Sequence, residues 1–174
     1  MKNQYVNNAE FLRQIVVYLD KVKEAEAVGD EPPRIPNTIG KCIYDIATRL
    51  SQKPNFINYP FREEMIGDGI ENAIKCIGNF NPEKSNNPFA YFTQVIWFAF
   101  LRRIQSEKKV LYIKHKVLEK EMLHINDNEE FTTTITMKPT DYMNEFVKTY
   151  EENMEEKKKK EIVKRGLEKF YEES

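Results

Sequence analysis

Apolar residues recur at intervals of three and four along most of the chain, which is the spacing of one face of an α-helix. Residues 5–28 show this pattern first, and Asn7 or Asn8 is placed to cap the helix. Gly29 ends the segment, and three prolines in 31–36 predict an extended connector because proline lacks the amide hydrogen that a helix needs. The expected buried positions of this first helix are Phe11, Leu12, Ile15, Val16, Leu19 and Val22.

Two further amphipathic helices are expected before residue 80. The second begins at a cap formed by Asn37 or Thr38 and ends before Pro54. The third runs from about Arg62 to Gly78, after a loop rich in aromatic rings. The apolar face of the second helix comprises Ile39, Cys42, Ile43, Ile46, Ala47 and Leu50, and that of the third comprises Ile66, Ile70, Ala73, Ile74 and Ile77.

A fourth helix is expected from Phe89 to about Lys109, with Asn87 as its cap and Pro88 at its first position. It is apolar nearly all round, so a central helix covered by its neighbours is one explanation of its rings. Residues 112–123 form a possible basic helix, 124–141 have no assignable period, and 142–171 regain helical composition. The charged run 151–160 is typical of a solvated helix face or a disordered tether.

These patterns predict an all-α fold, a compact helical domain followed by a flexible or helical extension. We expect a helical domain over 1–122, a charged linker over 123–160 and a tail over 161–174. With 174 residues the chain can bury a core without staples. Its two cysteines, Cys42 and Cys76, give no disulfide framework, and the start of the chain is not typical of a signal peptide. We therefore expect a soluble cytoplasmic protein.

Sequence motifs of enzymes are not evident. The chain has no glycine-rich phosphate loop, no nucleophile elbow and no helix with paired histidines. His115 and His124 are isolated in the sequence and are more typical of surface residues than of a general base or a metal ligand. We expect no catalytic activity, no cofactor and no metal site.

Charge is balanced overall but not locally. The 27 basic and 28 acidic residues give a formal charge of -1, which excludes a polycationic DNA coat. Residues 100–120 nevertheless contain seven Lys or Arg against two Glu. Cations next to aromatic rings favour binding to unpaired bases, because rings stack on bases and cations hold phosphates.

The preceding helix has the opposite charge. Residues 60–83 contain five acidic groups against two basic ones. Glu64, Asp68 and Glu71 would form an acidic stripe, next to glycines at 67 and 69 that permit close approach. Such a stripe suits a basic helical partner, although ordinary solvation explains it equally well.

Several short motifs follow one another along the chain: Asn37-Thr38-Ile39-Gly40, Glu64-Met65-Ile66, Asp68-Gly69-Ile70-Glu71, Asn87-Pro88, Ala90-Tyr91 and Thr93-Gln94. In this order they resemble the second conserved region of bacterial sigma factors, and most closely the small late-transcription sigma factors of T-even-type bacteriophages. The similarity covers roughly residues 5–115.

The resemblance implies a helical domain that docks on the core of bacterial RNA polymerase. Glu64, Asp68 and Glu71 would bind the coiled coil of the largest core subunit. The next helix would bind the non-template strand of an A/T-rich minus-ten-type promoter element as the duplex opens. Tyr91 and Arg102 match family positions. With the pattern of rings and cations, the expected DNA-binding set is Tyr91, Gln94, Trp97, Arg102, Arg103, Lys108 and Lys109.

This chain also departs from the pattern of the primary sigma factors. It has Gln94 and Val95 where they have two adjacent tryptophans, and Phe98 and Leu101 where they have a polar pair that reads duplex DNA. Base-specific roles therefore do not transfer to these positions. After residue 120 the sequence does not resemble a helix-turn-helix module, so we expect dependence on other proteins.

The C-terminal residues Leu167, Phe170 and Tyr171 place an aliphatic side chain before two rings, as in short anchors that enter apolar pockets. They resemble the tail by which phage late sigma factors attach to the DNA sliding clamp. The expected partners are thus core polymerase, promoter DNA, the phage clamp and a late co-activator, in the host cytoplasm at the nucleoid. The alternative is an inhibitor that occupies the sigma site without touching DNA.

Overall fold

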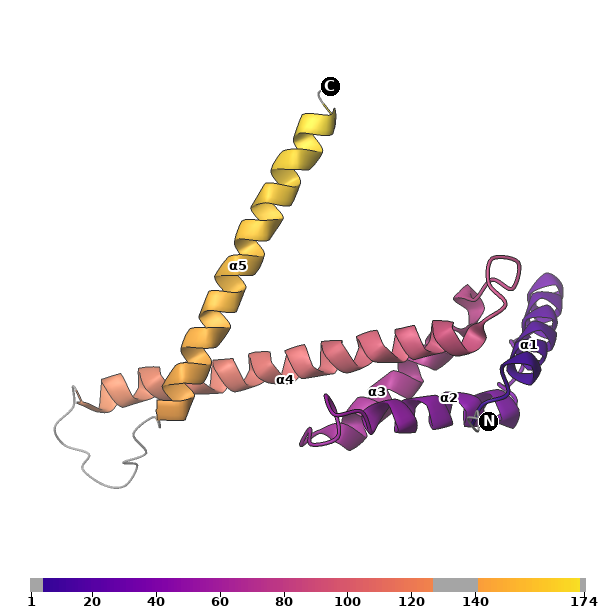
Figure 1. Ribbon diagram of the computed structural model, residues 1–174, viewed down its shortest axis with the longest axis horizontal. Helices are drawn as coiled ribbons and strands as arrows, with labels where there is room; N and C mark the ends of the chain where they lie inside the picture. Colours follow the sequence, from indigo (N-terminus) through magenta and orange to yellow (C-terminus); the bar gives the residue numbers. More distant parts are fainter. Residues whose placement is uncertain (1–4, 127–140, 173–174) are drawn as a thin grey trace. The chain divides into compact units, whose positions relative to one another are not determined.

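The computed structural model describes the backbone of residues 5–126 and 141–172 and the side chains of 5–120 and 142–164. Within these ranges the protein is all-helical, as predicted, and has no strand. The elements are α1 (Asn8–Val28), α2 (Asn37–Ser51), α3 (Arg62–Lys75), the 3₁₀ turn η1 (Ile77–Asn79), α4 (Pro88–Asn126) and α5 (Asp141–Glu172), as drawn in Figure 1.

The chain divides into two compact units, Met1–Gln105 and Ser106–Ser174. The first holds α1, α2, α3 and the beginning of α4, and the second holds the rest of α4 and α5. Each unit is described by itself below.

The helix ends follow side-chain chemistry where the sequence offers it. Asn7 caps α1 by accepting a hydrogen bond from the Glu10 amide (3.3 Å), and Gly29 ends that helix in the left-handed conformation (φ 82°). Asn87 caps α4 by accepting from the Ala90 amide (3.1 Å). All three features were predicted.

The predicted cap of α2 is wrong. Pro36 takes the N-cap position, with no side-chain cap, and its carbonyl accepts from the Gly40 amide (3.1 Å). Proline fits here because its φ is already fixed near the value required. The Thr38 hydroxyl points to α1 instead, where it donates to Gln14 (3.4 Å).

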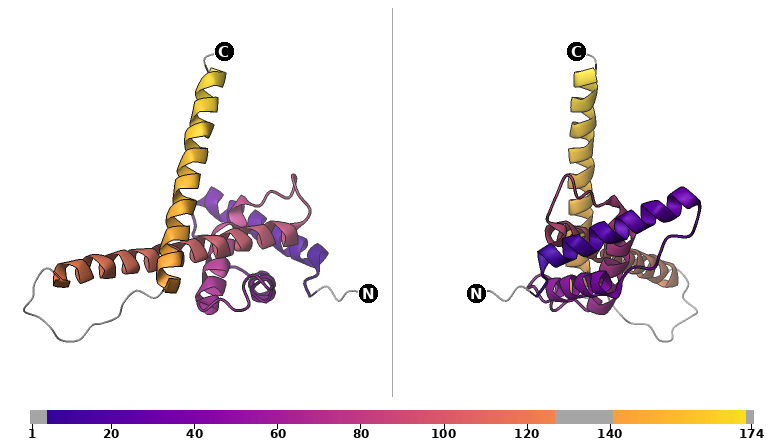
Figure 2. Two further views of the ribbon diagram at one scale, coloured as in Figure 1. Left: turned by 60° about the vertical axis from the view of Figure 1, so that its left-hand side comes forward. Right: turned by 90° about the vertical axis from the view of Figure 1, so that its right-hand side faces the viewer.

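The core of the first unit gathers apolar side chains from all of its helices. The expected faces of α1 and α2 are buried at Phe11, Ile15 and Leu19 and at Ile39, Ile43, Ile46, Ala47 and Leu50. Rings join the helices: Phe11 contacts Phe92 (5.4 Å between centroids), and Phe56 contacts Phe100 (5.2 Å). Figure 2 shows α1, α2 and α3 gathered around the beginning of α4.

The buried face of α3 differs from the predicted one. Met65, Gly69 and Ala73 are buried, whereas Ile74 is 42% exposed. The reason is a close approach to α4: a Cβ atom at Gly69 would lie 2.7 Å from Cε1 of Phe100 and 3.0 Å from Cγ2 of Ile96. With the glycine face turned to α4, the side chain of Ile74 points outward, and α3 ends at Lys75 rather than at residue 78.

The second unit is a pair of helices. α4 continues to Asn126 without the predicted break near Lys109, because no glycine or proline interrupts it. The ring of Tyr112 stacks on that of Tyr150 in α5 (4.6 Å), and His115 contacts Phe146 (5.9 Å). The helical prediction for 142–171 is confirmed. Of the predicted linker over 123–160, residues 127–140 lie outside the described residues, and the described remainder is helical, in α4 up to Asn126 and in α5 from Asp141.

Candidate nucleic-acid interface

One face of α4 in the first unit remains uncovered. Ala90, Gln94, Phe98 and Gln105 are exposed, Leu101 is half-buried between them, and their spacing puts them on the same side of the helix. Phe98 is 50% exposed. We call these five residues the open face. A half-exposed ring beside amide side chains is able to stack on a base.

Tyr91 and Arg102 form one border of the open face. The Tyr91 hydroxyl donates to the carbonyl of Cys76 (3.1 Å), its ring lies against Phe80 (5.3 Å), and burial raises its pKa. Arg102 is exposed, and its Nη2 donates to Oδ1 of Asn72 in α3 (2.7 Å). Tyr91 is therefore anchored by the protein, while the Arg102 guanidinium keeps further donors directed to solvent.

Trp97 forms the opposite border. Its ring is half-buried, with its centroid 4.9 Å from that of the buried Phe56. The Nζ atom of Lys53 lies 5.6 Å from the Trp97 centroid, within the range of a cation–π contact. Lys53 is absent from the set expected from sequence. It lies in the α2–α3 connector, and no motif or periodicity relates it to Trp97; only the packing of Phe56 brings them together.

Arg103 faces α3 rather than the open face. Its Nη1 lies 3.3 Å from Oδ2 of Asp68, and the two side chains are 26% and 36% exposed. The sequence assigned Asp68 to the polymerase and Arg103 to DNA. The structure brings them together, so in the isolated chain each already neutralises the other.

The remaining acidic residues of α3 point outward. Glu64 is exposed, and Glu71 is exposed but paired with Lys75 (2.5 Å), whose hydrogen bond lowers the pKa of Glu71. Since Asp68 is also paired, the stripe presents less negative charge than the sequence suggests. Glu64 is its most available carboxylate.

The other predicted residues belong to the second unit. Lys108 and Lys109 are exposed. The side chains of Leu167, Phe170 and Tyr171 lie outside the described residues, although the backbone there is helical.

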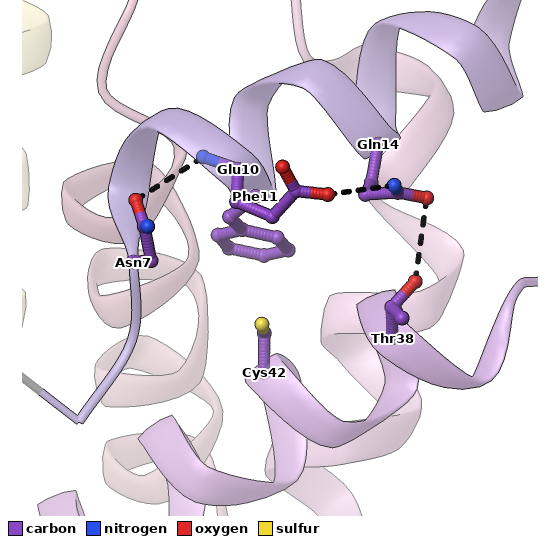
Figure 3. Close-up of a pocket in the computed structure, with 6 residues that line it drawn as sticks. All are labelled: Asn7, Glu10, Phe11, Gln14, Thr38 and Cys42. Atoms are coloured by element: carbon purple, nitrogen blue, oxygen red, sulfur yellow. Dashed lines mark hydrogen bonds between the residues drawn. The ribbon is translucent and has the colours of Figure 1, made fainter.

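A small pocket of about 70 Å³ lies between α1 and α2 (Figure 3). Phe11 and Cys42 form its floor, and Asn7, Glu10, Gln14 and Thr38 form its rim. Gln14 donates to Glu10 (2.8 Å) and accepts from Thr38 (3.4 Å), so the rim groups bond mainly to each other. The pocket is far smaller than the several hundred Å³ of typical ligand sites. Burial raises the pKa of the Cys42 thiol, which makes it a poor nucleophile.

Among the residues that the structure describes, no three His, Cys, Asp or Glu side chains are grouped to hold a metal ion. None of the described helices has both the length and the apolar character required to span a membrane. No known protein family and no curated protein matches this chain.

Proposed function

We propose that the protein is a promoter-specificity subunit of RNA polymerase, of the phage late sigma type. The observation that carries this proposal is the open face of α4, where the half-exposed ring of Phe98 lies between one border with Arg102 and another with Trp97. A ring platform bordered by a cation suits a strand whose bases are unpaired. The sequence motifs that resemble those of sigma factors support the same proposal.

In this proposal the two helices bind different partners. α3 presents Glu64, Asp68 and Glu71 to the coiled coil of the polymerase, whereas α4 binds the opened A/T-rich minus-ten-type strand. Tyr91, Gln94, Trp97 and Arg102 are the proposed DNA contacts of the first unit, and Lys108 and Lys109 are those of the second unit. Arg103 stays with Asp68 until a polymerase cation replaces it. The polymerase performs the chemistry, and this chain performs none.

The coupling to a sliding clamp is proposed from the sequence of the tail. Leu167, Phe170 and Tyr171 would enter an apolar pocket of the clamp, and a late co-activator would assist. Removal of the last ten residues should abolish clamp-dependent activation and leave core binding intact. Equal loss of both would refute the tether.

The function is tested by transcription with host core polymerase on two templates with an A/T-rich start site, one fully paired and one with a mismatched bubble. A sigma factor yields a specific start on the bubble template without other factors. An inhibitor that fills the sigma site without touching DNA yields none, and this outcome would replace our proposal by the alternative. Phe98→Ala is the informative variant, because it removes the open-face ring without touching the core.

A further inference from the structure

We propose that Lys53, together with Trp97, forms a second phosphate-binding edge, at the border of the open face opposite Arg102. The DNA strand would then cross α4 instead of following only the border with Arg102. The inference rests on the proposed function and adds a residue from the α2–α3 connector to the binding surface. The ligand is the sugar–phosphate backbone of an unpaired DNA strand.

The backbone around Lys53 is held in a fixed position. Its carbonyl accepts from the amides of Phe56 (2.9 Å) and Ile57 (3.0 Å), and its own amide donates to Leu50 (3.1 Å). Phe56 is buried, and its ring contacts both Trp97 (4.9 Å) and Phe100 (5.2 Å). The connector is therefore fastened to α4, and Lys53 keeps its place beside the open face.

The ammonium of Lys53 is available for an anion. The residue is exposed, and within the described ranges no carboxylate lies within ion-pair distance of it. Its contact with Trp97 uses the face of the ring and leaves N–H donors free, since an ammonium has three. A phosphate bound there would displace a counterion, which is the main source of affinity for nucleic-acid backbones.

A second cation–ring pair extends this edge. Arg49, one turn earlier at the end of α2, lies over the ring of Tyr5 (4.3 Å from Cζ to the centroid), and Tyr5 contacts Phe89 at the start of α4 (5.7 Å). Arg49 and Lys53 are both exposed and four residues apart. The side of α4 opposite Arg102 thus carries two cations, each resting on a ring.

Cations on both borders define a direction for the strand. A strand that binds Arg102 on one border and Lys53 on the other must pass over the open face, where Phe98 is available to stack. A strand that follows only the border with Arg102 would not meet Lys53. The two paths differ in their dependence on Lys53.

The experiment measures binding of a dye-labelled, A/T-rich single-stranded oligonucleotide to the complex of the full chain with core polymerase, by fluorescence anisotropy over a series of salt concentrations. The variant is Lys53→Gln, which removes the charge and keeps an unbranched, polar and slightly shorter side chain. The control is Lys41→Gln, another exposed lysine, which lies near the beginning of α2, the helix before the connector. Arg102→Gln tests the border of the open face that the proposed function already assigns to DNA.

Lys53→Gln should weaken binding on the order of threefold at physiological salt and reduce the salt slope by about 0.7, the value for one phosphate of a single strand. Lys41→Gln should change neither. The outcome that overturns the inference is a wild-type affinity and slope for Lys53→Gln while Arg102→Gln loses affinity, which would leave the proposed function intact. No binding by the wild-type complex would instead reject the proposed function.

A second measurement reports contact directly. Trp97 is the only tryptophan of the chain, so 5-fluorotryptophan incorporated into this protein alone gives a single ¹⁹F resonance in the complex with unlabelled polymerase. The oligonucleotide should shift this resonance in the wild type, and less in Lys53→Gln. A resonance that does not move when DNA is bound would place the strand away from Trp97 and overturn the inference.

Discussion

The two parts of α4, before and after Gln105, are both rich in apolar residues but differ in burial. In the first part Phe92, Ile96 and Phe100 are fully buried. In the second part an aliphatic stripe is exposed, each member by at least 40%: Val110, Leu111, Ile113, Val117 and Leu118. The difference lies in the neighbours. The first part packs on α1, α3 and the ring-rich connector, whereas α5 contacts the second part through Tyr112 and His115, which lie on another side of the helix.

Apolar composition therefore does not determine which side chains of α4 are buried. Their burial depends on which other elements pack against each part of the helix. Apolar side chains stabilise a fold when they are removed from water. We therefore expect the buried side chains in the first part of α4 to contribute far more to the stability of the first unit than the exposed aliphatic stripe contributes to that of the second unit. The following substitutions test this contrast.

The largest effect is expected at Phe100. Replacement of this buried ring by alanine should lower the free energy of unfolding by about 3–5 kcal/mol, because it leaves a cavity against Phe56 and Gly69. Phe98→Ala is the matched control, two residues away and half exposed, and should cost about 1 kcal/mol or less. Urea unfolding followed by circular dichroism measures both. Similar losses at the two positions would contradict the expectation that the buried ring of Phe100 contributes more to stability than the half-exposed ring of Phe98.

The next effect is expected at Gly69, where α3 meets α4. The added methyl of Gly69→Ala would lie 2.7 Å from Cε1 of Phe100, so the buried Phe100 ring or the helix itself must shift, at a cost of about 1–3 kcal/mol. Gly67→Ala is the control in the same helix, since nothing lies within 4 Å of its Cβ. It should stabilise the protein by about 0.5–1 kcal/mol, the usual gain of alanine over glycine inside a helix. Urea unfolding followed by circular dichroism distinguishes the expected destabilisation by Gly69→Ala from the expected stabilisation by Gly67→Ala.

The sequence predicts most of the fold because its helices carry clear periods and stops. The faces of α1 and α2, the end of α1 at Gly29 and the start of α4 at Pro88 follow from local chemistry. The orientation of α3 does not, because it depends on a ring of α4 that fits against a glycine distant in sequence. The periodicity places Ile74 near the apolar face of α3. It does not show which residues of that face contact α4.

The candidate site is less predictable than the fold for the same reason. Residue types and motifs point to α4 and to the acidic stripe of α3. They do not show that Asp68 and Arg103 bind each other, or that Lys53 lies on Trp97, because both contacts join segments far apart in sequence. The exposure of Phe98 likewise depends on which neighbours cover α4.

A smaller effect is expected for the ion pair between α3 and the first part of α4. A double-mutant cycle of Asp68→Asn and Arg103→Gln should give a coupling of about 0.5–1 kcal/mol, since both groups are partly exposed. The pair Glu71 and Lys75, within one turn of α3, serves as the control and should give a smaller coupling, because both side chains are more exposed. A coupling near zero would mean that the contact between Asp68 and Arg103 does not stabilise the packing of α3 on α4.

The aliphatic stripe of the second part should tolerate polar residues. The double variant Leu111→Gln and Leu118→Gln should change the free energy of unfolding by no more than about 0.5 kcal/mol, because these side chains are exposed and glutamine is a good helix former. Phe92→Gln with Ile96→Gln, the matched pair in the first part, should prevent folding. Circular dichroism at equal concentration compares the two. A severe loss from the first pair would contradict the exposure of the stripe.

The smallest effect is expected from pH, and it again separates the two parts of α4. In the second part the Tyr112 hydroxyl donates to Glu151 (2.9 Å), and this bond, followed by that from Lys116 (3.2 Å), lowers the pKa of Glu151 below its ordinary 4.5. A lowered carboxyl pKa contributes stability above the unfolded value and loses it as the pH falls through the folded one. The same hydrogen bond raises the pKa of Tyr112 above 10.0, so that contribution is lost as the pH rises through the folded value.

In the first part the Tyr91 hydroxyl donates to a backbone carbonyl, which does not titrate. Acidification below pH 4.5 should therefore shift the NMR resonances of Tyr112 and its stacked neighbour Tyr150, and leave those of Tyr91 unchanged. Glu151→Gln should remove the acid transition at Tyr112, whereas Glu152→Gln, an exposed neighbour, should retain it. A transition that persists in Glu151→Gln would assign the pH dependence to another group and separate it from the contact between α4 and α5.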